Sequence, residues 1–166
     1  MKIPLMIITT MLVLTACTPH VMMNHPQISS EEIFIAEMIP HHQEAVDSSK
    51  LMLQSKNPQV QALAESIISA QEREISMMQE WIRTWYSSSN YKNTYQNMMP
   101  ELSSLQGDAK DKAYLKGMIN HHQGAIEMAK QAQKLDIRTE VRALTEDIIS
   151  TQEMEMTQIN QLLKES

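Results

Sequence analysis

The strongest constraint on the fold is an internal repeat, because one segment of the chain returns eighty residues later. The segment at 38–43 reads MIPHHQ, and 118–123 reads MINHHQ. Over 34–50 against 114–130, seven of seventeen positions are identical, and over 60–75 against 141–156 ten of sixteen are. The repeat predicts two copies of one helical hairpin. Residues that both copies keep are therefore the candidates for function.

The N-terminus has the pattern of a bacterial lipoprotein signal peptide over residues 1–16. Lys2 precedes an apolar run at 3–15, which is too short to span a bilayer, and Leu-Thr-Ala then leads into Cys17. We expect Cys17 to be lipidated and to anchor the protein to a membrane; the alternative is an ordinary signal peptide with an incidental cysteine. Cys17 is the only cysteine, so the mature protein has no disulfide and no Cys-based metal site. Thr18, where an Asp would retain a lipoprotein, favours the outer membrane facing the periplasm if the cell has one.

Composition points to one all-α domain. Removal of residues 1–16 leaves 150 residues, with 13 basic against 20 acidic side chains and a formal charge of −7. No basic stripe is present, so nucleic acid is not an expected partner. Only three glycines and few aromatics occur, while Gln, Glu, Ala, Met and Leu abound, as is typical of helices. Residues 17–29 are expected to form a flexible tether, whose soft-metal ligands are explained more simply by composition: His20, Met22, Met23 and His25.

Helix signals divide the remaining chain into four helices. They are expected over about 30–55, 58–86, 108–135 and 136–164. Ser29-x-x-Glu32 fits a capping box, and Pro40 is expected to kink the first helix or open one backbone bond. Asn57 and Asp108 are predicted N-caps, while 87–107 forms a linker that is long for a compact domain. Short turns after the first and third helices predict two antiparallel hairpins (30–86 and 108–164) and a four-helix bundle over 30–164.

The polar residues that both repeats contain are predicted to share one buried layer. At about 100° per residue, Gln71 and Glu74 fall within the apolar stripe of the second helix, and Gln152 and Glu155 do the same in the fourth. The histidines at 41–42 and 121–122 flank the inward faces of the first and third helices. Distances along the chain to the turns place all these residues at one level. Burial of a carboxylate without a partner is costly, so the layer either satisfies itself or holds a cation.

Two classes of function follow from this layer. In the first, Glu74 and Glu155 accept hydrogen bonds from the histidines and only fix the helix register. In the second, the layer binds metal. Di-iron bundles use Glu-x-x-His, whereas Met38 and Met118 stand three residues before histidines here, which favours a softer metal, especially Cu(I). Haem with Met or His ligands stays open, but c-type attachment is excluded because Cys-x-x-Cys-His is missing. No nucleophile–base–orienter set supports a hydrolase; a metal-dependent redox enzyme is a weaker alternative.

The same residues give the chain a family resemblance. FI-x-x-MIPHHQ, followed by II-x-x-Q-x-x-EI-x-x-M and a tryptophan, resembles domain-of-unknown-function family 305 over about 30–164. The resemblance implies a ferritin-like bundle and an envelope copper-binding protein of the kind implicated in copper tolerance. It assigns as metal ligands Met38, His41, His42, Glu74, Met78, Met118, His121, His122 and Glu155, supported by Gln71 and Gln152. Asn120, Gly124 and Ile159 depart from the first copy, so a weaker or asymmetric second half-site is expected.

The sequence thus predicts a lipid-anchored envelope protein that binds copper for buffering, scavenging or tolerance, without an organic cofactor and without enzymatic activity. The alternative is a structural or partner-binding lipoprotein whose polar layer is a metal-free hydrogen-bond network.

Overall fold

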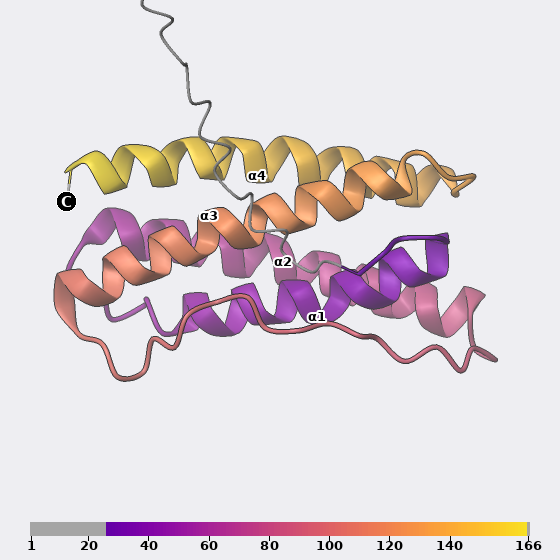
Figure 1. The fold of residues 1–166 in the computed structure, drawn as a ribbon, viewed down its shortest axis with the longest axis horizontal. Helices are drawn as coiled ribbons and strands as arrows, with labels where there is room; N and C mark the ends of the chain where they lie inside the picture. Colours follow the sequence, from indigo (N-terminus) through magenta and orange to yellow (C-terminus); the bar gives the residue numbers. More distant parts are fainter. Residues whose placement is uncertain (1–25, 166) are drawn as a thin grey trace, which may run out of the picture.

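A computed structural model of the chain describes residues 26–165, and within them it contains four helices and no strand. The helices are α1 (Glu31–Lys50), α2 (Pro58–Trp85), α3 (Gly107–Ala132) and α4 (Thr139–Glu165). α1 and α2 form one antiparallel hairpin, α3 and α4 form another, and α1 packs on α3 while α2 packs on α4 (Figure 1). The expected fold class, an all-α, ferritin-like four-helix bundle of two repeated hairpins, is confirmed.

The first hairpin has side-chain caps at the start of both helices. Ser30 is extended and its Oγ accepts from the Ile33 amide at 3.2 Å, so the capping box predicted at Ser29 is wrong. Asn57 is the cap of α2, as predicted, and accepts from the Gln59 amide at 3.0 Å. α1 continues through Pro40 as one helix.

The second hairpin departs from prediction at its start. Gln106 occupies the N-cap of α3 without a side-chain cap bond, so the cap predicted at Asp108 is wrong. Asp108 lies in the first turn instead, where its charge favours the positive end of the helix dipole. Gly107 begins α3 with a φ of +55°, a conformation that other residues rarely adopt and that displaces the cap by two positions.

Both turns within the hairpins begin earlier than predicted. α1 ends at Lys50 rather than near 55, and α3 ends at Ala132 rather than near 135. The residues that follow wind more tightly, with bonds three residues apart such as Ser55 N to Met52 O at 2.9 Å. Helix periodicity in the sequence does not distinguish such a tight turn from a further helical turn. α4 likewise begins at Thr139 and not at Asp136.

The core is split into two apolar clusters by the polar layer. Along every helix, residues of one cluster come first, then the polar residues, then residues of the other cluster. The first cluster includes Phe34, Met38, Met78, Trp81, Met128, Val141, Leu144 and Ile148; the second includes Ala45, Val60, Leu63, Ile67, Tyr114, Met118, Ile159 and Leu162. Hydrophobic burial on both sides thus holds the polar side chains at a fixed level in the bundle.

The long connection between the hairpins is held against the bundle. Residues 87–106, here called the strap, run back along α1 from the end of α2 to the start of α3 (Figure 1). Leu102 is buried in the second cluster and fixes the far end of the strap. Helix signals predict only a long linker here, yet the strap follows α1 over most of its length (Figure 1).

The predicted tether is shorter than expected. Ile28 is buried in the first apolar cluster, and its amide donates to Gln131 Oε1 at 3.0 Å. Residues from about 28 onward therefore belong to the bundle. The signal peptide, Cys17 and the His20–His25 segment lie outside the described residues. No helix between residues 26 and 165 is long and apolar enough to cross a membrane.

Candidate metal site

Four fully buried histidines form a row across the middle of the bundle. The His41 and His121 rings meet at its centre, with ring centroids 3.8 Å apart. His42 lies 6.2 Å from His41 on one side, and His122 lies 6.3 Å from His121 on the other. The structure thus brings together all four predicted histidines, two from each repeat.

Helix geometry explains why the adjacent histidines have different neighbours. Successive residues of a helix point about 100° apart, so one of each pair faces the other hairpin and the second faces its own hairpin. His41 and His121 meet at the contact between α1 and α3. His42 faces α2, and His122 faces α4.

The outer histidines contact the two layer glutamates, of which Glu74 is partly buried and Glu155 is buried. His42 Nε2 and Glu74 Oε2 form a hydrogen bond of 2.7 Å. An ionised carboxylate only accepts, so this Nε2 carries the proton and Nδ1 keeps the lone pair with which an imidazole binds metal. His122 Nε2 lies 2.7 Å from Glu155 Oε2, but its N–H is not aligned as a hydrogen bond. The two repeats therefore differ in the alignment of this contact.

The central pair is oriented by acceptors from α1. His121 Nε2 lies 3.0 Å from the backbone oxygen of His41 and 3.5 Å from Glu44 Oε2. A carbonyl oxygen cannot donate, so His121 Nε2 carries the proton and its Nδ1 holds the lone pair. At His42 and His121 a hydrogen-bond acceptor at Nε2 thus selects the same tautomer, and at His122 a carboxylate oxygen lies 2.7 Å from the same atom.

The predicted methionines lie on both sides of the row. Met38 and Met78 are buried in the first apolar cluster, and Met118 is buried in the second. The thioethers therefore lie on both faces of the layer. Met38 and Met118 each precede a histidine by three residues, and because α1 and α3 run in opposite directions, the two methionines lie on opposite sides of the row.

The layer holds more polar groups than its own hydrogen bonds satisfy. Gln71 is 2% exposed, and neither atom of its amide has a hydrogen-bond partner. Gln152 Oε1, His42 Nδ1 and His122 Nδ1 are also buried without one. A buried polar group left unpaired costs about 1–3 kcal/mol of folding stability. A layer that served only to set the helix register would therefore lower the stability of the bundle.

The arrangement is not a cage of hard or borderline ligands. Among residues 26–165, no group of three or more His, Cys, Asp or Glu side chains is placed to hold a metal ion. Structural zinc sites need four such ligands. Neutral imidazoles with nearby thioethers instead suit a soft cation of low coordination number such as Cu(I).

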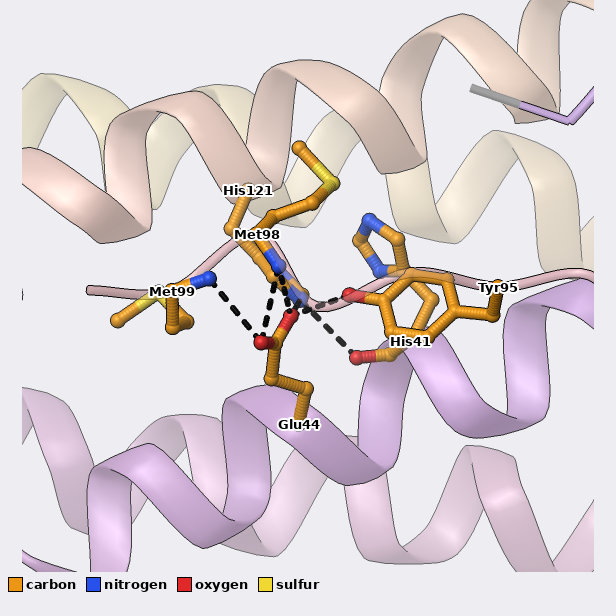
Figure 2. A network of polar contacts seen from close by, with 6 residues as sticks. All are labelled: His41, Glu44, Tyr95, Met98, Met99 and His121. Carbon is orange, nitrogen blue, oxygen red and sulfur yellow. Dashed lines mark hydrogen bonds and ion pairs between the residues drawn. The ribbon is translucent and has the colours of Figure 1, made fainter. Parts of the chain in front are cut away.

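Sequence reasoning missed Glu44 and the strap residues that surround it. Glu44 accepts from the Met98 amide at 2.9 Å, from the Met99 amide at 3.0 Å and from the Tyr95 hydroxyl. The Tyr95 ring stands edge-on to His41, with centroids 5.4 Å apart (Figure 2). Burial and the Glu44 carboxylate raise the pKa of Tyr95 far above its usual range, so its hydroxyl stays a donor. The sequence contained one signal for the role of Glu44: the equivalent position of the second repeat is Gly124, so the two repeats differ there.

Fold and site together define a duplicated four-helix bundle with a buried row of histidines. The chain belongs to the DUF305 family, a domain of unknown function whose family model matches residues 31–163. The predicted family is therefore confirmed. No curated protein sequence matches the chain.

Solved structures with the same fold include copper-bound proteins. CopM in the Cu(I)-bound form is 33% identical, with a TM-score of 0.74 and a match that covers 82% of this chain and 96% of CopM. CopM structures in Cu(II)-bound and Ag-bound forms also match. A DUF305 fragment from Deinococcus radiodurans is 28% identical, with a TM-score of 0.71 and coverage of 85% and 100%.

Proposed function

We propose that this protein binds a soft cation, Cu(I) first of all, in the histidine layer and acts as a copper buffer or scavenger in the cell envelope. The observation that carries the proposal is the row of four buried histidines, three of which have an oxygen at Nε2 and so keep Nδ1 as a possible ligand atom. The similarity to CopM, which is known with Cu(I), Cu(II) and Ag bound, supports it.

The proposal gives the buried residues distinct roles. The histidines supply neutral nitrogen ligands, and Met38, Met78 and Met118 supply thioethers from the two adjoining clusters. Glu74 acts through His42, whose Nε2 proton it accepts, and Glu155 acts through His122, whose Nε2 lies 2.7 Å from its carboxylate. In this proposal the glutamates orient the histidine ligands. The family resemblance had instead assigned Glu74 and Glu155 as metal ligands. Copper is cargo here, and no reaction is assigned to it.

Titration with Cu(I) tests the proposal directly. Under anaerobic conditions, the protein without its signal peptide should compete with a Cu(I)-specific chelator, and Zn(II) should not displace the bound Cu(I). Binding should weaken on acidification, because protons compete with the metal for imidazole nitrogens. Failure to withdraw any Cu(I) from the chelator would overturn the proposal.

The alternative, a metal-free structural network, is favoured by two observations. Glu74 already pairs with His42 at hydrogen-bond distance, and three-ligand groups of His, Cys, Asp or Glu are absent within 26–165. Against it, neither atom of the Gln71 amide has a hydrogen-bond partner within the protein. The two functions differ in the response of protein stability to copper.

A lipid anchor on Cys17 completes the proposed function. Wild-type protein expressed with its signal peptide should fractionate with membranes, because the acyl chains on Cys17 provide the attachment. The Cys17→Ser variant cannot carry these chains and should be released. Mass spectrometry of the mature N-terminus should show an acylated Cys17 as the first residue. An unmodified Cys17 in soluble envelope protein would contradict the anchor.

A further inference from the structure

The strap covers the central histidine pair at the contact between α1 and α3. α1 offers two acidic side chains to it: Glu37, which accepts from the Thr94 amide at 2.7 Å and from Tyr91, and Glu44, which binds Tyr95 and the amides of Met98 and Met99. Glu44 also lies 3.5 Å from His121 Nε2. Figure 2 shows Tyr95, Met98 and Met99 of the strap around His41, Glu44 and His121.

The two repeats are specialised for this contact. Glu37 and Glu44 of α1 correspond to Gly117 and Gly124 of α3. A Cβ at Gly117 would lie 2.5 Å from Pro100 Cδ and 3.2 Å from Met99 Cε, so only glycine allows the strap to approach α3 this closely. One repeat therefore supplies carboxylates that hold the strap, and the other supplies the space that it fills.

Two residues that line a surface groove also contact the central pair. Beside the strap lies a groove lined by residues that include Glu44, Asp47, Tyr95, Met99 and Glu101. Tyr95 and Glu44 thus face this groove and also contact the pair, Tyr95 through the His41 ring and Glu44 through His121 Nε2. The carboxylates and the Met99 thioether at the groove suit the approach of a cation, while His41 and His121 themselves are fully buried.

We propose that the strap is a gate over the His41–His121 pair, closed by the Tyr95–Glu44 bond, and that a soft cation enters and leaves through the adjoining groove when this bond opens. The inference rests on the proposed function, which gives the pair its ligand. It goes further by assigning control of the exchange rate to residues that lie outside the ligand set. A gate of this kind speeds or slows loading and release equally and leaves the affinity unchanged.

Tyr95→Phe tests the gate, with Tyr91→Phe as the matched control. Both variants remove one tyrosine hydroxyl from a strap–α1 carboxylate bond, but only Tyr95 contacts the histidine pair. For Tyr95→Phe we expect Ag(I) association and its release to a chelator, both by stopped flow, to accelerate about tenfold, the effect of one lost hydrogen bond to a charged acceptor. The dissociation constant should change by less than about twofold, and Tyr91→Phe should match wild type.

A second measurement needs no metal. Diethyl pyrocarbonate acylates accessible imidazoles, so peptide mass spectrometry should show faster modification of His41 and His121 in apo Tyr95→Phe than in wild type or Tyr91→Phe. Circular dichroism checks that both variants are folded. Unchanged modification rates in folded Tyr95→Phe would overturn the gate even if the metal binds. Absence of Ag(I) and Cu(I) binding in wild type, with faster modification in Tyr95→Phe, would overturn the proposed function and leave the gate over the pair.

Discussion

Replacement of both His41 and His121 with alanine is expected to weaken Cu(I) binding by a hundredfold or more, about 2.7 kcal/mol of binding free energy. The two ring centroids are 3.8 Å apart at the centre of the row, so the double variant removes one possible ligand from each repeat where the two repeats meet. Anaerobic competition against a Cu(I) chelator measures the change. If the variant retains wild-type affinity, the central pair is not part of the site.

Two controls separate loss of ligands from loss of structure. The variant leaves a cavity in a fully buried place, so His41→Gln/His121→Gln, which keeps polarity and most of the volume, should show the same loss of affinity with a smaller loss of stability. His20→Ala/His25→Ala, in the N-terminal segment, removes the same number of imidazoles and should change affinity by only a small factor. An equal loss in this control would place the copper site in the N-terminal segment instead.

The sequence was sufficient for the fold and for the level of the polar layer. Both follow from local periodicity and from the equal spacing of the repeats, since His41 lies 14 residues before the predicted helix end at 55 and Gln71 lies 13 residues after the predicted start at 58. The sequence did not predict which histidine of each pair faces which neighbouring helix. The rotation of α1 about its axis decides which of the two histidines faces α3. His41 and His42 flank the centre of the inward face, so the sequence allowed either one. Packing of α1 on α3 made His41 the central residue.

The strap could not be predicted from periodicity, because its contacts are long-range and polar. Glu37 and Glu44 sit about two turns apart on α1 and resemble ordinary surface residues, yet Glu37 is fully buried. Their partners, Tyr91 and Tyr95, are more than fifty residues away in a segment without helical pattern. The comparison of repeats held the signal: acidic residues in one copy stand opposite glycines in the other.

Removal of the two layer glutamates is expected to distinguish a metal site from a structural network. Glu74→Ala/Glu155→Ala removes the acceptor of the His42 Nε2 proton and the carboxylate 2.7 Å from His122 Nε2. A stranded buried donor costs on the order of 1–3 kcal/mol, so the apo protein should melt at a lower temperature. Loss of such a residue behind a metal ligand also weakens metal affinity by about 10–100-fold. The copper-loaded protein should therefore lose more stability than the apo protein.

The matched control for this variant lies two residues away in each repeat. Glu72 and Glu153 stand on the same helices as the layer glutamates, but each is about half exposed and pairs with a surface lysine. Glu72→Ala/Glu153→Ala removes the same two charges and should cost less than about 1 kcal/mol, equally with and without copper. Any copper-dependent difference between the two double variants then reports the position of the carboxylates and not the net charge.

Thermal unfolding of wild type, Glu74→Ala/Glu155→Ala and Glu72→Ala/Glu153→Ala, each with and without Cu(I), gives the comparison. A hundredfold excess of Cu(I) over its dissociation constant adds about 2.7 kcal/mol to the wild type, a rise of several degrees in a bundle of this size. The surface variant should keep that rise, and the layer variant should lose about half of it or more. In a structural network, the layer variant melts earlier but copper shifts none of the three midpoints. A wild-type midpoint indifferent to Cu(I) would therefore reject the metal site and leave the hydrogen-bond network as the function of the layer.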